Sequence, residues 1–258
     1  RIKCQIYPAM QLGGTPPQLF DQAKDGVADI VWTLPTYQAG RFLKSEVFEL
    51  PFMARNAETG SPAFYEFVQK NSLDEFKGVK ILALHLHDGS LLHFKDRRVA
   101  SMDELKGLKV RAPTRIGTKF LAAIGAAPVQ MPVPQVTESL AKGVIDGAMV
   151  PWEGVPAIKL HEISKVSLGV PEGQPRFGTT IFVFAMNQAK YDSLPADLKK
   201  VIDNNSGAAL SQQIGKTWDA SAGPGRKLAQ ERGNVLYTIP ASEIDNWVKV
   251  SAPMYDEW

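Results

Sequence analysis

The segment Leu105-Lys106-Gly107-Leu108-Lys109-Val110-Arg111-Ala112-Pro113 is the most informative part of the sequence, because it joins the end of a helix to a short buried strand. We expect the helix to begin at Ser101, whose hydroxyl would cap it in a capping box with Glu104. Pro113 has no N–H and forces an extended residue before it, so the strand should end there and a helix should follow at 114–123. Arg111 then lies at the carboxyl end of a strand, where open α/β sheets bind their ligands.

The side chain of Arg111 suits a ligand with a carboxylate. A guanidinium is planar and permanently charged, and its fork of N–H groups matches the two oxygens of a carboxylate in a way that lysine does not. A structural ion pair with an Asp or Glu of the chain itself is the alternative that this residue leaves open.

The composition is that of an ordinary globular chain, with 258 residues, 44% apolar and 22% charged. Its 29 Lys and Arg nearly balance 27 Asp and Glu, so there is no basic field of the kind that binds nucleic acid or membrane surfaces. No run approaches the roughly 18 apolar residues of a membrane span. No signal peptide is visible, which does not exclude export because mature chains have lost it.

Strand-like and helical patterns alternate along the chain, which predicts an α/β fold with mostly parallel sheets. The strands are expected at 1–7, 29–33, 79–87, 128–131, 144–149 and 177–186, and the helices at 16–24, 57–69, 134–142, 152–161 and from Leu194-Pro195 onward. Gly223-Pro224-Gly225 should kink or end the last helix. Cys4, the single cysteine, has apolar neighbours that predict a buried position in the first strand.

Signatures of catalysis are weak. His85 and His87 alternate on one strand with His93 nearby, so three imidazoles could hold zinc, or serve an α/β enzyme as acid and base. Without Cys or acidic partners we favour a strand surface, and we expect no metal and no cofactor. Ser139-Leu140-Ala141-Lys142 matches S-x-x-K without the companion motifs, and no phosphate-binding or nucleophile-elbow motif occurs. The sequence therefore offers a ligand anchor and no reaction centre, which argues against an enzyme.

Several motifs, in order, carry a family resemblance. Leu105 to Pro113 is followed by Gly143-Val144-Ile145-Asp146-Gly147 and by Tyr191-Asp192-Ser193-Leu194-Pro195, and it is preceded by Tyr7-Pro8-Ala9-Met10-Gln11-Leu12-Gly13 and Lys24-Asp25-Gly26-Val27-Ala28-Asp29. Over nearly the whole chain these motifs resemble the DctP-like solute-binding proteins of tripartite ATP-independent periplasmic (TRAP) transporters.

The resemblance implies a two-domain periplasmic-binding-protein fold, with a mixed sheet in each domain, crossing strands and a long interdomain helix. The first domain would comprise residues 1–90 and 179–222, and the second 91–178 and 223–258. Since such proteins usually begin with a further strand and helix and end with more helix, we expect this chain to be trimmed at both ends. We expect a periplasmic monomer, with its signal peptide removed, whose partners are a small organic acid and the membrane subunits of the transporter, with no nucleic acid.

The resemblance also implies a binding site. Arg111 matches the arginine that clamps the substrate carboxylate, whereas the Glu, Arg and Asn of sugar-acid members align with Leu34, Leu91 and Val150. Each apolar replacement would leave a ligand hydroxyl buried without a partner, at about 1–3 kcal/mol. The remaining expected site residues are Trp32 and Trp152, which could be flat apolar walls or core residues, and Val133, Phe177 and Thr180.

We therefore expect a protein that captures an organic monocarboxylate with an apolar, even aromatic, body and delivers it to a TRAP transporter. A short keto or hydroxy acid is the alternative ligand. An α/β enzyme that uses His85, His87 or His93 is the more distant alternative.

Overall fold

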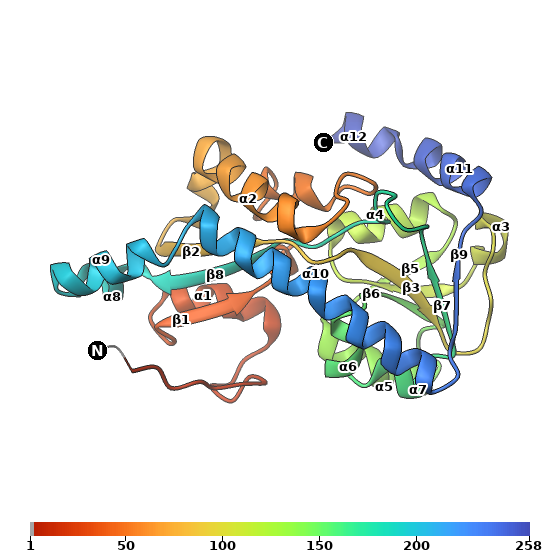
Figure 1. Cartoon of the computed structure of the whole chain (residues 1–258), viewed down its shortest axis with the longest axis horizontal. Coiled ribbons are helices and arrows are strands. Elements are labelled where there is room, and N and C mark those ends of the chain that lie inside the picture. The colour runs from red at the N-terminus through yellow and green to blue at the C-terminus, as the bar shows by residue number, and fades with distance from the viewer. Residues whose placement is uncertain (1–2) are drawn as a thin grey trace.

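The computed structural model describes residues 3–258 and places two β-sheets side by side, with α10 running across both (Figure 1). The strands of the described chain are β1 (Ile30–Thr33), β2 (Val79–His85), β3 (Ser90–Phe94), β4 (Lys109–Ala112), β5 (Ala127–Gln130), β6 (Gly147–Pro151), β7 (Val166–Gly169), β8 (Phe182–Asn187) and β9 (Val235–Thr238). The predicted α/β class with two sheets is confirmed.

The helices surround these sheets. They are α1 (Leu19–Lys24), α2 (Ala57–Phe67), α3 (Met102–Leu105), α4 (Arg115–Ala123), α5 (Val136–Ala141), α6 (Gly154–Ala157), α7 (Leu160–Ile163), α8 (Gln188–Asp192), α9 (Ala196–Asn204), α10 (Ala208–Glu231), α11 (Ala241–Ser251) and α12 (Pro253–Glu257). Short 3-10 helices span Pro16–Gln18, Pro35–Tyr37, Ser45–Glu49, Leu73–Phe76 and Val133–Gln135, and a π turn spans Val68–Ser72.

The smaller sheet has the order β1-β8-β2, and both of its strand pairs are antiparallel. One of its faces packs Val31, Ile81 and Val183 against the buried rings of Phe20 and Phe64, which come from α1 and α2. This apolar face gives that half of the molecule its own core.

The larger sheet has the order β5-β4-β6-β3-β7-β9. Its strand β4 is parallel to both β5 and β6, so the carboxyl ends of these three strands meet at one edge. Arg111 is the third residue of β4 and lies at that edge, as the sequence predicts. One face of the sheet packs on a core cluster that contains Val110 and Ala112, and the other face packs on a cluster that contains Ala148 and Val150.

The two sheets are joined by two crossing segments that lie next to each other. One runs from β2 to β3 through His87, and the other enters β8 through Gly178 and Thr180; Ser90 N–H donates to the carbonyl of Gly178 at 2.9 Å. α10 is the third connection, because it contacts α2 and β2 at one end and α6 and α7 at the other. The predicted division into two domains at residues 90, 178 and 222 stays a prediction.

Several predicted elements need correction. The sheets are not mostly parallel: the described strand pairs comprise three parallel and four antiparallel ones, because β3 and β8 return antiparallel to their neighbours. Residues 3–7 form no strand and Cys4 is exposed, because no described strand pairs with them; residues 1–2 of that prediction lie outside the described chain.

Other corrections concern where elements begin and end. α10 continues through Gly223-Pro224-Gly225, so the predicted end there is wrong. The helix predicted at 152–161 is divided into α6 and α7 by Lys159, whose φ of 54° lies in the left-handed region. Ser101 makes no capping bond through its side chain, and Glu104 instead accepts from the N–H of Ala100. The sequence reading did not identify β3, β7, β9, α11 or α12.

Candidate functional site

Arg111 is held almost completely inside the larger sheet, with 2% of its surface exposed. Its Nε donates to the carbonyl of Met131 at 2.9 Å and its Nη1 donates to the carbonyl of Met149 at 2.7 Å. These carbonyls come from the chain beyond β5 and from β6, the two neighbours of β4, so the sheet itself orients the guanidinium. Among residues 3–258 no Asp or Glu pairs with Arg111, so the internal ion pair is not formed.

Burial lowers the pKa of Arg111 to about 10, and the hydroxyl of Tyr37 acts in the opposite direction by hydrogen bonding to the charged form. The side chain is therefore cationic at neutral pH. A buried charge without a counter-charge is costly, and its remaining N–H groups are suited to an anion that the protein itself does not supply.

Two of the predicted apolar site residues share the sheet face of Arg111. Arg111 is paired with Ala148 in β6, and Val150 lies two residues further along that strand, so both side chains point to the same face. Leu91 is paired with Val150 across β3 and β6 and also lies on this face. Val150 is fully buried and Leu91 partly buried, within one apolar cluster. The structure thus brings a cation and an apolar surface together.

Trp152 follows Val150 at the end of β6 and is 7% exposed. Its ring contacts His93 edge-on at 5.1 Å and packs in the same cluster as Val150. Of the two roles expected for Trp152, a pocket wall or a core residue, its burial favours the core residue. It supports the wall behind Val150 and is almost closed to solvent.

Tyr37 is the residue that the sequence reading missed. It ends the 3-10 helix that follows β1, where its N–H donates to the carbonyl of Leu34 at 3.2 Å. Its hydroxyl accepts a hydrogen bond from the N–H of Val133 at 3.2 Å and also interacts with Arg111. Leu34 and Val133, two predicted site residues, are thereby placed next to Tyr37. A cavity of about 220 Å³ adjoins this point and is lined by Pro17, Tyr37, Pro113, Gln130, Met131 and Pro132.

Two predicted site residues lie apart from Arg111. Phe177 is fully buried on the opposite face of the larger sheet, where its ring stacks on Trp247 at 5.0 Å. Trp32 lies on the smaller sheet, is 45% exposed, and donates through Nε1 to His85 Nε2 at 2.8 Å. Trp32 also stacks on Phe182, so it is neither a core residue nor a neighbour of Arg111.

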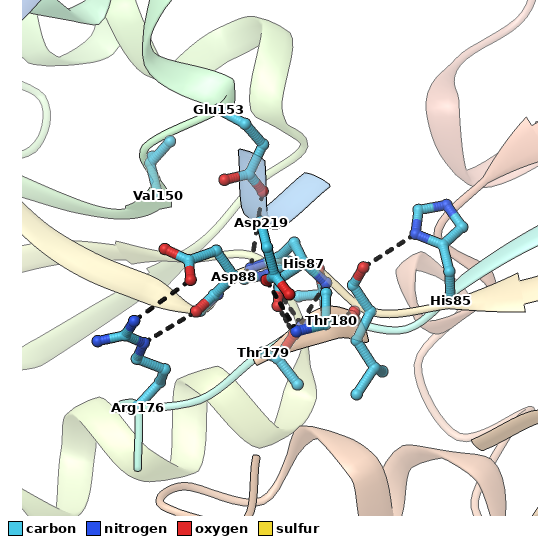
Figure 2. Close-up of polar contacts among 12 residues, drawn as sticks. His85, His87, Asp88, Val150, Glu153, Arg176, Thr179, Thr180 and Asp219 are labelled. Atoms are coloured by element: carbon cyan, nitrogen blue, oxygen red, sulfur yellow. Dashed lines mark hydrogen bonds and ion pairs between the residues drawn. The ribbon is translucent and has the colours of Figure 1, made fainter. Parts of the chain in front are cut away.

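Thr180, the last predicted site residue, belongs to a buried polar cluster where the chain crosses between the sheets (Figure 2). Its N–H donates to His87 Nε2 at 3.0 Å. The other ring nitrogen of His87 lies 3.8 Å from a carboxyl oxygen of Glu153, which follows Trp152. Asp88 in the same crossing pairs with Arg176 at 3.3 Å.

The pKa values of this cluster are shifted toward neutral side chains. Burial lowers the pKa of His87 to about 3, and the charges of His85 and Arg111 act in the same direction. Burial, together with the carboxylates of Asp88 and Asp219, raises the pKa of Glu153 to about 8. One carboxyl oxygen of Glu153 has no hydrogen-bond partner among the described residues.

The histidines that the sequence suggested for zinc or acid–base chemistry are spread over separate contacts. His85 bonds Trp32, His87 bonds Thr180, and His93 lies between Ser167 Oγ at 2.9 Å and the carbonyl of Val150 at 3.0 Å. Across residues 3–258 there is no group of three His, Cys, Asp or Glu side chains arranged to hold a metal ion. Burial is the main cause that lowers the pKa of His85 and His93, each to about 4.

Comparison with known proteins gives a consistent result. The family model for bacterial extracellular solute-binding proteins, family 7 (DctP), matches residues 1–258. A TRAP solute-binding protein from Rhodoferax ferrireducens T118, solved with copurified benzoate, is 48% identical, with 98% of this chain and 78% of that chain covered and a TM-score of 0.96.

Two further relatives extend the comparison. A marine metagenome TRAP solute-binding protein specific for aromatic acid ligands, solved with metahydroxyphenylacetate, is 46% identical, with 100% of this chain and 81% of that chain covered and a TM-score of 0.97. The C4-dicarboxylate-binding periplasmic protein DctP of Rhodobacter capsulatus is 22% identical over 99% of this chain and 76% of its own length. Within residues 3–258, no helix combines the length and apolar character needed to cross a bilayer.

Proposed function

Since the chain belongs to family 7 of the bacterial extracellular solute-binding proteins, we propose that it captures an aromatic monocarboxylate and delivers it to the membrane subunits of a TRAP transporter. Its periplasmic location follows from the family. The protein would act by binding and release, as a monomer, without changing its ligand.

The observation that carries the proposal is the buried guanidinium of Arg111, which has no carboxylate partner among the described residues and shares its sheet face with Val150 and Leu91. A ligand carboxylate would supply the missing counter-charge through two hydrogen bonds. The apolar ligand body would gain about 25 cal/mol for each Å² removed from water. Leu34 and Val133, next to Tyr37, would complete the pocket.

The solved relatives support a ring as the apolar body. Benzoate and metahydroxyphenylacetate both combine a carboxylate with an aromatic ring, and they were found in proteins that share nearly half of their residues with this chain. Hydroxyl-rich sugar acids should bind weakly, because Leu34, Leu91 and Val150 would leave their buried hydroxyls without hydrogen-bond partners.

Calorimetry with benzoate, sialic acid, a uronic acid and pyruvate tests the proposal. We expect benzoate to bind well and the two sugar acids to fail. Arg111→Ala should weaken benzoate binding by about 3–5 kcal/mol, because the ligand charge would be buried alone. Arg111→Lys should recover only part of the loss, since an ammonium lacks the fork.

The exposed Arg97 supplies the control, and Arg97→Ala should bind benzoate like the parent. Benzoate affinity of Arg111→Ala within threefold of the parent would show that the anchor is misassigned. Tight binding of a sugar acid, or of pyruvate in place of aromatic acids, would contradict the proposed ligand class while leaving the family unchanged.

A further inference from the structure

Tyr37 lies where the loop after β1 meets the Arg111 edge of the larger sheet. The 3-10 helix Pro35–Tyr37 fixes its backbone, and the hydroxyl oxygen accepts from the N–H of Val133 at 3.2 Å, a contact between residues 96 positions apart. The same hydroxyl hydrogen-bonds Arg111 and raises its pKa against the effect of burial. Tyr37 belongs to the first predicted domain, whereas Arg111 and Val133 belong to the second.

The hydrogen-bonding capacity of this hydroxyl is only partly used. A phenol has one proton to donate and two lone pairs that accept. The N–H of Val133 occupies one lone pair, and the guanidinium of Arg111 interacts with the same oxygen, so neither contact uses the hydroxyl proton. Within residues 3–258 no acceptor receives a hydrogen bond from the Tyr37 hydroxyl. The hydroxyl proton of Tyr37 is thus available beside the buried cation of Arg111, where an anion that binds the guanidinium could also accept from the phenol.

The guanidinium has spare capacity on the same side. Of its five N–H groups, one on Nε and one on Nη1 bind the carbonyls of Met131 and Met149. Three N–H groups remain, which is more than the hydroxyl of Tyr37 can accept, so N–H groups are left for a ligand. A carboxylate has about four acceptor positions on its two oxygens, so it can accept from the guanidinium and from the phenol together.

We propose that the hydroxyl of Tyr37 donates a hydrogen bond to the ligand carboxylate that Arg111 binds, so that both predicted domains hold one charged group. This inference rests on the proposed function, because it requires a carboxylate ligand at Arg111. It adds a contact through which ligand binding favours the association of the loop after β1 with the larger sheet. The competing interpretation is that the hydroxyl only braces Val133 and Arg111.

The test is benzoate titration of Tyr37→Phe by calorimetry, together with thermal unfolding of the ligand-free protein. Loss of a hydrogen bond to a charged group should weaken benzoate binding about 10- to 100-fold. The melting temperature without ligand should also fall, because the contacts of the hydroxyl with Val133 and Arg111 are lost. The affinity therefore decides, because a purely structural brace would leave it almost unchanged. A double-mutant cycle with Arg111→Lys should be non-additive, because both residues contact the same carboxylate.

Tyr255→Phe is a matched control, since the Tyr255 hydroxyl donates to the carbonyl of Pro51 and is a structural bond elsewhere in the molecule. It should lower the melting temperature and leave benzoate affinity unchanged. If the parent binds benzoate and Tyr37→Phe binds it within threefold, the inference about Tyr37 is overturned and the proposed function stands. If only a non-aromatic carboxylate binds, the proposed aromatic ligand class is wrong, and titration of Tyr37→Phe with that carboxylate decides the role of Tyr37. If no carboxylate binds, the proposed function and the inference about Tyr37 are both overturned.

Discussion

At the residue scale, the protein buries a base, Arg111, and an acid, Glu153, and burial shifts their pKa values in opposite directions. Arg111 keeps its charge because the carbonyls of Met131 and Met149 and the hydroxyl of Tyr37 accept from it. Glu153 has a carboxyl oxygen without a partner, and the nearby carboxylates of Asp88 and Asp219 disfavour a further negative charge. Its carboxyl group therefore binds a proton to a pKa of about 8. The groups around Arg111 favour its charged form, whereas the carboxylates around Glu153 disfavour its charged form.

Glu153→Gln should reveal this protonation through the pH dependence of stability. The pKa of Glu153 rises from 4.5 in the unfolded chain to about 8 in the fold, so the folded state binds more protons between these values. Its contribution to the stability of the parent is therefore greatest below pH 4.5 and falls as the pH rises toward 8. The Gln variant lacks that fall. Urea unfolding should show that the variant gains roughly 1–4 kcal/mol relative to the parent from pH 5 to pH 8.

The exposed Glu66 provides the control for this comparison, because Glu66→Gln should follow the pH dependence of the parent. Parallel stability curves for Glu153→Gln and the parent would mean that the cluster around His87 tolerates an ionised Glu153.

At the element scale, α10 is shaped by the two glycines at which it meets the rest of the chain. A Cβ on Gly215 would lie 2.2 Å from the carbonyl oxygen of Ala57, and one on Gly225 would lie 2.1 Å from the carbonyl oxygen of Trp152. These contacts are too short for any side chain, so the helix can approach α2 and the end of β6 only through glycine. Trp152 follows the strand of Val150, and α10 therefore supports the wall of the proposed pocket.

Gly225→Ala and Gly223→Ala give a direct comparison within this helix. Gly223 has open space around the position of a Cβ, so alanine there should stabilise the protein by up to about 1 kcal/mol through helix propensity. Gly225→Ala should instead destabilise it, by about 1–3 kcal/mol, because the backbone at Trp152 must move. It should also weaken benzoate binding. Chemical denaturation of both variants checks the result, and equal stabilisation by both would contradict the close packing.

The sequence predicted those elements correctly whose boundaries are set by neighbouring residues. Gly107 and Pro113 bound a single strand, and the structure has β4 there, with α4 starting one residue beyond Thr114, its N-cap. It failed where an element depends on a distant partner. β7 is a short apolar run that becomes a strand only by pairing with β3 and β9, and Tyr37 is a site residue only through its contact with Val133, far along the chain. The position of Arg111 at the end of β4 could be predicted because a strand end next to a proline needs no distant partner to be recognised.

At the scale of the whole molecule, three connections join the two sheets. The crossings meet at the bond from Ser90 to Gly178, and α10 passes both sheets (Figure 1). The proposed ligand lies at the Arg111 edge, where the loop with Tyr37 reaches the larger sheet. A ligand held from both sides favours the state in which the two sides are close, by its difference in affinity for the two states.

Ligand should therefore convert an open form into a closed one, with flexing near Ser90, at 177–180 and in α10 near Gly223-Pro224-Gly225. Small-angle scattering of the parent should give a smaller radius of gyration at saturating benzoate than without it. Arg111→Ala at the same benzoate concentration should keep the larger value, which separates closure from any general effect of the solute. If calorimetry shows that the parent is saturated and its radius of gyration is unchanged, the site is rigid, and Arg111 and Tyr37 hold their ligand without movement of the crossing segments.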